Sequence, residues 1–159
     1  MLRLTRQSDY AIVLMTHFAA IPDKTVQNAR DLAASANLPL PTVSKILKAL
    51  ARASLLVSHR GVKGGYSLAR KPEGITVAEI IEALEGPIAL MECTAGPGHC
   101  EKEPHCQVRE PWVRINRAIH QTLERVTLDE LVGAGHGELP LLEIQKLPTR
   151  DAASEPTSR

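Results

Sequence analysis

Residues 39–69 read PLPTVSKILKALARASLLVSHRGVKGGYSLA, and this stretch decides the fold. Pro41 suits the first turn of a helix, where the N–H that proline lacks has no partner anyway. Apolar residues follow at helical spacing, at Val43, Ile46, Leu47 and Leu50. The other positions are polar or basic, at Thr42, Ser44, Lys45, Lys48 and Arg52. The pattern predicts a helix with one buried face and one polar, basic face in solvent.

The residues before this helix predict two more. A helix from about Ser8 to Ile21 is expected from an apolar stripe at Ala11, Leu14, Met15, Phe18 and Ala19. A short helix should begin at Asn28, whose side chain suits an N-cap, and should stop near Asn37. Two short helices joined by a tight turn, the second of them polar and basic outside, form a helix-turn-helix.

The residues after the polar helix predict a β-hairpin. The segment 55–60 has strand character, 61–65 is a glycine-rich basic turn, and 66–69 is a return strand. A hairpin directly after the second helix of a helix-turn-helix makes it a winged helix. We therefore expect a mainly α fold that binds double-stranded DNA. The side chains expected in the major groove are Thr42, Ser44, Lys45 and Lys48, and Arg60 and Lys63 in the wing would contact phosphates or a minor groove.

Charge is distributed unevenly along the chain. Residues 1–72 contain 11 Lys and Arg against 3 acids, whereas residues 73–159 contain 8 basic and 15 acidic residues. A basic half attracts a polyanion and an acidic half repels one. This distribution favours DNA binding by a first domain, residues 1–72.

The second half predicts a further helical unit, residues 73–132. A helix from Thr76 to Leu84 should end at Gly86 and Pro87. Pro111 opens a longer helix to about Val126, with an apolar stripe at Trp112, Ile115, Ile119, Leu123 and Val126. That stripe fits either packing on the same chain or a helix pair in a dimer. Thr127 and Glu130 have the spacing of a capping box and predict a short last helix. Residues 133–159 are expected to be a mostly disordered tail.

All three cysteines lie within fourteen residues, at Cys93, Cys100 and Cys106. Thiolates on such a Gly- and Pro-rich loop can surround one metal centre. Three alternatives follow from the residues: an iron–sulfur cluster, a structural zinc site completed by His99 or His105, and a metal-free thiol switch. The chain has no run of about 18 apolar residues, so no membrane span is predicted. A cytoplasmic protein is expected. No phosphate loop, paired-carboxylate site or oxyanion motif points to an enzyme.

Several segments together resemble a known family of regulators. They are the opening LRLTRQSDYA (2–11), LPLPTVSK (38–45), RGVKGGY (60–66), ITVAEII (75–81) and the three cysteines. The chain resembles the iron–sulfur-sensing winged-helix regulators typified by IscR, NsrR and RirA, over roughly residues 1–132. It is most similar to the regulators of SUF iron–sulfur assembly genes.

The resemblance implies a homodimeric transcriptional repressor in which the long helix crosses its partner. It also implies a cluster held by Cys93, Cys100 and Cys106, either 2Fe–2S or 4Fe–4S. Some members take a fourth ligand from a His three residues after the last cysteine, but that position is Arg109 here. Others use an Asp of the first helix, which corresponds to Asp9.

Overall fold

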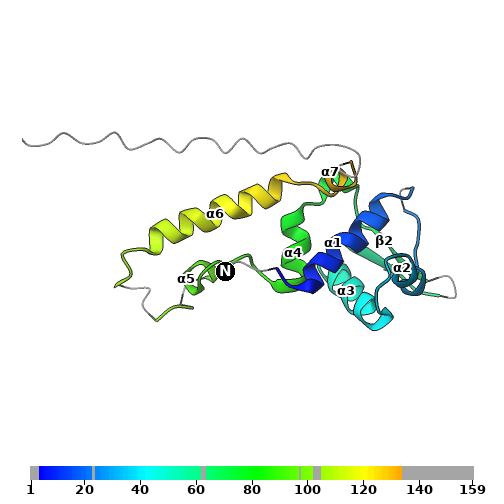
Figure 1. Cartoon of the computed structure of the whole chain (residues 1–159), viewed down its shortest axis with the longest axis horizontal. Helices are drawn as coiled ribbons and strands as arrows, with labels where there is room; N and C mark the ends of the chain where they lie inside the picture. Colours follow the sequence, from blue (N-terminus) through cyan, green and yellow to red (C-terminus); the bar gives the residue numbers. More distant parts are fainter. Residues whose placement is uncertain (1–3, 23, 62–63, 97, 102–104, 134–159) are drawn as a thin grey trace, which may run out of the picture.

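The computed structural model describes residues 4–22, 24–61, 64–96, 98–101 and 105–133. The elements follow in the order α1 (Arg6–Ala19), α2 (Ala29–Ser35), α3 (Leu40–Arg52), β1 (Leu56–His59), β2 (Gly65–Leu68), η1 (Pro72–Gly74), α4 (Val77–Glu85), α5 (Glu92–Ala95), α6 (Arg109–Arg125) and α7 (Leu128–Gly133). Figure 1 shows α1 to α4, the hairpin and α7 in one body, with α5 and most of α6 extending to one side. The predicted mainly α winged helix-turn-helix is confirmed. The predicted tail, from residue 134 on, lies outside the described residues.

Side-chain caps explain where the first two helices begin. Thr5 caps α1 by accepting from the Ser8 N–H, so this helix starts two residues before its predicted position. Asn28 caps α2 as predicted, with its Oδ1 accepting from the Asp31 N–H at 2.9 Å. Each cap satisfies one of the N–H groups that a helix leaves without a partner.

The turn of the helix-turn-helix depends on a left-handed residue. Asn37 has a φ of 51°, and the N–H of Leu38 donates to the Ala33 carbonyl at 2.9 Å. Asparagine tolerates this conformation better than most residues, because its short polar side chain can bond locally. The chain therefore reverses directly from α2 into α3, which begins after Pro39.

The core is mostly aliphatic. Its fully buried side chains come mainly from the inner faces of α1 and α3, namely Leu14, Met15, Phe18, Ile46, Leu47 and Leu50. Ile75, Ile80 and Leu128 join the same cluster. Burial of such side chains contributes about 1.5–3 kcal/mol each. The core thus fixes α4 and the start of α7 against the helix-turn-helix.

The wing is a two-stranded antiparallel sheet in which Leu56 pairs with Leu68 and His59 with Gly65. The strands lie within one residue of their predicted positions, and residues 62 and 63 at the tip, including Lys63, lie outside the described residues. The loop before α2 joins the sheet, because Gln27 and Tyr66 exchange backbone hydrogen bonds of 2.9 and 2.8 Å. The wing is therefore fastened to the helix-turn-helix by backbone contacts.

A second backbone bridge joins the start of α4 to the end of α6. Val77 N–H donates to Val126 at 2.9 Å, and Leu128 N–H donates to Ile75 at 2.8 Å. Thr76 and Thr127 face each other in this bridge, and each caps the helix that follows it, with Glu79 and Glu130 respectively. The segment from Gly86 to Val126, here called the cysteine arm, therefore leaves the body through α4 and returns to it at this bridge.

We predict that Gly65→Ala loosens the wing. A Cβ at Gly65 would lie 2.7 Å from the carbonyl carbon of Gln27 and closer still to its oxygen. Overpacking of this kind typically costs about 1–3 kcal/mol. Urea unfolding should show this loss of stability.

The matched control is Gly74→Ala, where the nearest atom is Arg70 Cδ at 3.8 Å. This variant should stay within about 0.5 kcal/mol of the unmodified protein. Equal stability of the two variants would show that Gln27 does not pack on the wing as described.

Candidate functional site

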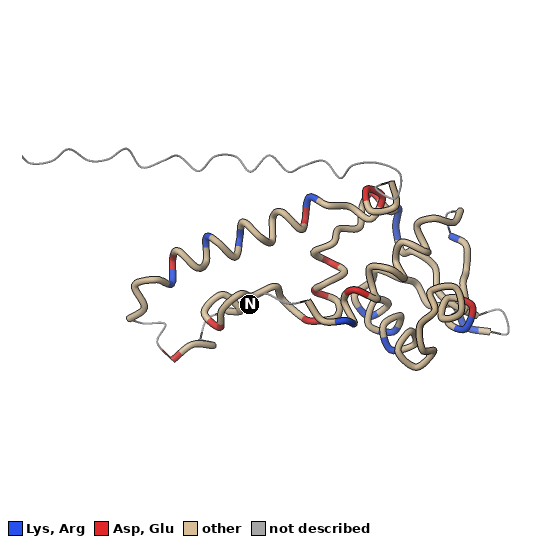
Figure 2. The backbone as a smooth tube through the Cα atoms, viewed as in Figure 1, with Lys and Arg blue, Asp and Glu red and all other residues tan. Residues whose placement is uncertain are grey.

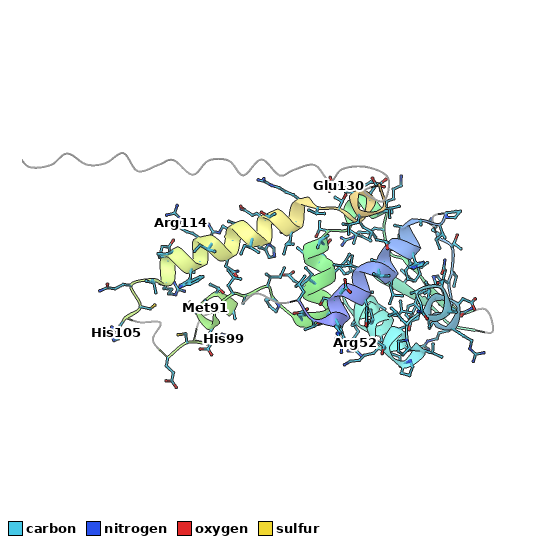
Figure 3. All side chains as sticks on the ribbon, viewed as in Figure 1. Arg52, Met91, His99, His105, Arg114 and Glu130 are labelled. Carbon is cyan, nitrogen blue, oxygen red and sulfur yellow. The ribbon has the colours of Figure 1, made fainter. Side chains whose placement is uncertain are left out.

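The outer face of α3 carries the predicted DNA-contacting residues. Lys45, Lys48 and Arg52 are exposed, and Thr42 and Ser44 are half-buried beside them. Figure 2 marks the basic residues on the tube of α3, and Figure 3 shows Arg52 pointing away from the body. The helix has no acidic residue and no side-chain cap at its first turn. This face can therefore present hydrogen-bond donors and positive charges to a polyanion.

Arg60 is exposed and directly follows β1. Near its turn, the wing is ordered by a cross-strand hydrogen bond of 2.8 Å between His59 Nε2 and the buried Ser67 Oγ. The structure thus presents Arg60 on the same hairpin that Gln27 fastens to the helix-turn-helix.

The cysteine arm is more regular than its sequence suggests. We expected a loop with little secondary structure, but Cys93 lies in the short helix α5. Thr94 explains the difference, because its Oγ1 accepts from the Met91 N–H at 3.2 Å and donates to the Met91 carbonyl at 2.7 Å. Cys93 is buried, whereas Cys100 and Cys106 are half-buried, and all three thiols are free.

The predicted ligands are not gathered in this single chain. Among the described residues, no three side chains of His, Cys, Asp and Glu form a group that could hold a metal ion. Asp9 is exposed on the first turn of α1. His99 Nδ1 shares a hydrogen bond of 3.2 Å with the Gly96 carbonyl, and His105 is exposed at the far end of the arm (Figure 3).

Asn116, a residue that sequence reasoning missed, holds the arm together. Its Nδ2 donates to the Ile88 carbonyl at 2.9 Å, and its Oδ1 accepts from the Leu90 N–H at 3.0 Å. The side-chain amide therefore makes the same pair of hydrogen bonds to the segment before α5 that a backbone peptide group would make. An asparagine within a long amphipathic helix was the only sequence signal.

Two carboxylates of α4 were also missed: one holds α4 to the start of α1, and the other connects α4 to the arm. Glu85, the last residue of α4, accepts from the Thr5 N–H at 2.9 Å and from the Ser8 hydroxyl, one residue before Asp9. The hydrogen bond from Ser8, followed by that from Thr5, holds the pKa of Glu85 below its ordinary value. Glu82 lies 3.0 Å from His120 Nε2, which connects α4 to α6.

The α6 helix has a second, uncovered apolar side. No residue of α6 is fully buried in the single chain, and Val108 and Ile115 are 55% and 46% exposed. Val108, Trp112, Ile115 and Ile119 lie at spacings of three and four, so they share one face. The predicted stripe is therefore only partly covered by the rest of this chain.

The helix-turn-helix, its wing and the arm lie within one matched family model. Residues 4–134 match the Rrf2 model, described as an iron-dependent transcriptional regulator. The chain belongs to the Rrf2 family. It is therefore a helix-turn-helix transcriptional regulator and not an enzyme. The expected likeness to IscR- and NsrR-type regulators is confirmed.

Individual relatives cover nearly the whole described chain. The regulator CymR of Bacillus subtilis is 30% identical over 86% of this chain and 94% of its own length. NsrR of Oceanobacillus iheyensis is 26% identical over 92% of this chain and 100% of its own length. Among solved structures, CymR, titled the global cysteine regulator of B. subtilis, matches with a TM-score of 0.66 at 30% identity, covering 84% of this chain and 98% of CymR. IscR of T. potens matches with a TM-score of 0.57 at 27% identity, covering 84% and 88%.

No described helix of this chain meets the length and hydropathy needed to cross a bilayer.

Proposed function

We propose that this protein is a homodimeric repressor that senses an iron–sulfur cluster and controls iron–sulfur assembly genes of the SUF type. The observation that carries the proposal is the placement of all three cysteines on one arm, which is joined at both ends to the DNA-binding body. The family model, described as iron-dependent, supports it.

In this proposal the outer face of α3 enters the major groove. Thr42 and Ser44 hydroxyls are suited to base edges, while Lys45 and Lys48 are suited to phosphates or guanine. Arg60 in the wing would contact the backbone or a minor groove. Two such units in a dimer would bind half-sites about one helical turn apart.

Lys45→Ala should weaken operator binding and lower its salt dependence. A lost phosphate contact reduces the slope of log K against log salt by about one, because fewer counterions are released. The operator can be selected from random duplexes, and binding can then be measured by fluorescence anisotropy at several salt concentrations.

Arg114→Ala is the matched control, since Arg114 projects from α6 on the cysteine arm, far from α3 (Figure 3). It should leave both affinity and slope unchanged. If Lys45→Ala behaves like this control, α3 does not contact DNA through Lys45.

The donor set fits an iron–sulfur cluster. Three thiols on a short segment supply the soft ligands that such clusters need, and two of them are half-buried and accessible. Cys93, Cys100 and Cys106 would hold the cluster, either 2Fe–2S or 4Fe–4S, with Asp9 contributed across the dimer as fourth ligand. When bound, the group supplies a centre whose stability responds to iron, oxidants and nitric oxide.

The chain's own contacts explain how a change at the cysteines can reach the DNA-binding face. Asn116 connects the backbone before Cys93 to α6, and Glu85 connects the end of α4 to the first turn of α1. Because α1, α3 and α4 share one core, a displacement at the junction of Glu85 with α1 would carry α3 with it.

We expect Cys100→Ala to lose visible absorption, iron and acid-labile sulfide after anaerobic purification. The operator affinity of the variant should equal that of metal-free protein. His105→Ala is the control, because an exposed His outside the ligand set should keep the cluster. A Cys100→Ala protein with unchanged iron content and regulation would refute cluster sensing through this residue.

The uncovered side of α6 supports the dimer. We expect Ile115→Glu to convert a dimer to monomers in analytical ultracentrifugation, because it places a charge in an apolar helix contact. Val57→Glu is matched in exposure, at 44% against 46% for Ile115, but lies in the wing. Val57→Glu should remain dimeric. If Ile115→Glu also remains dimeric, this face of α6 is excluded as the interface.

A metal-free thiol switch is the second candidate. Three free thiols within one segment favour it, and a 27% identical relative, CymR of Staphylococcus aureus, is known in a crystal structure titled an oxidised form. A structural zinc site with His99 or His105 is the third. Metal analysis of the anaerobic protein separates the three candidates. The cluster protein would contain iron, the structural-site protein would contain zinc, and the thiol switch would contain neither metal.

A further inference from the structure

A cavity of about 350 Å³ opens between α5 and α6. The α5 region contributes Cys93 and Thr94, and α6 contributes Arg109, Asn116, Arg117 and His120. None of the described residues that line the cavity is acidic. Its volume is within the range of small-molecule sites, about 300–1,000 Å³.

The described lining of the cavity carries two arginines, Arg109 and Arg117, and no carboxylate. Among the described residues, Arg117 forms no hydrogen bond or ion pair. Glu82 and Glu124 lie near the two ring nitrogens of His120, at 3.0 and 3.4 Å, but neither lines the cavity. A guanidinium beside such a space suits an oxyanion, because its planar N–H groups match carboxylate and phosphate.

The wall between the two helices is fixed in place. Both polar atoms of Asn116 are used by the Ile88 carbonyl and the Leu90 N–H, so the linker into α5 is held against α6. His120 is likewise held by Glu82 of α4. A ligand would therefore meet a largely preformed site and would not need to order these side chains.

We propose that this cavity binds a small oxyanion that carries phosphate or carboxylate groups, with Arg117 as its cationic contact. The binding requires no metal, so the inference goes beyond the proposed function, and its effect on regulation rests on the role proposed there for Cys93. Because Cys93 lines the same cavity, the bound anion would cover the Cys93 thiol. The anion would then act as an effector that competes with chemistry at this cysteine.

Isothermal titration calorimetry of the full-length protein, freed of metal by a chelator, tests the site. The probes are inorganic phosphate, succinate and the neutral succinamide, with ionic strength held constant by chloride. We expect phosphate or succinate to bind and succinamide to give no heat. Binding of only one anion would identify which of the two chemistries the site accepts.

Arg117→Gln and Arg114→Gln form the matched pair of variants. Both remove one positive charge from α6, but Arg114 projects away from α5 (Figure 3) and does not line the cavity. Arg117→Gln should weaken anion binding by about tenfold or more, the loss expected for a charge-assisted hydrogen bond. Arg114→Gln should change it by less than about twofold. Equal losses would mean that the anion responds only to surface charge and would overturn the proposal.

Site-resolved alkylation gives a second readout. Bound anion should slow the reaction of Cys93 with iodoacetamide while leaving Cys100 and Cys106 unchanged, as followed by peptide mass spectrometry. Circular dichroism of Arg117→Gln confirms that the variant is folded. Absence of binding by both anions to the unmodified protein, or equal protection of all three cysteines, contradicts the proposed site.

Discussion

The return of the cysteine arm to the body depends on one short backbone bridge between the start of α4 and the end of α6. Thr76 and Thr127 pair there, and each also caps the helix that follows it. Glu79 of the first cap also binds Arg70, which follows the wing, at 2.5 Å. Partial burial raises the pKa of Glu79, but hydrogen bonds from Thr76 and Arg70 outweigh it and lower the pKa overall. One joint therefore connects the wing, α4 and α6 and keeps its carboxylate ionised.

This joint gives the two ends of the arm different kinds of attachment. At the bridge the arm is attached by backbone hydrogen bonds and by hydrophobic packing, because Ile75 and Leu128 are fully buried beside it. Further along, the polar contact between Glu82 and His120 attaches α6 to α4, and Asn116 holds the two sides of the arm together. Polar contacts of this kind contribute only about 0.5–3 kcal/mol each, so they can exchange without unfolding the body. That contrast suits a segment that changes state beside a stable DNA-binding unit.

The site is shaped by the two sides of α6. One side faces α4 and α5 and carries Asn116, His120 and the cationic cavity, while the adjacent side exposes Ile115. The periodicity of the sequence identified only an apolar stripe and left open whether it packs within the chain or in a dimer. The stripe alone could not decide, because both solutions need the same spacing of apolar residues.

The sequence by itself determined the helix-turn-helix, its wing and the cysteine segment, because caps such as Asn28, the stripe of α3 and a glycine-rich turn are local signals. Only the tertiary structure decided how the arm is held. Asn116 contacts backbone 26 and 28 residues away, and Glu85 contacts Ser8 and Thr5 across 77 and 80 residues. Nothing in the spacing of polar side chains reveals such partners, since a hydrogen bond depends on which surfaces the packed core brings together.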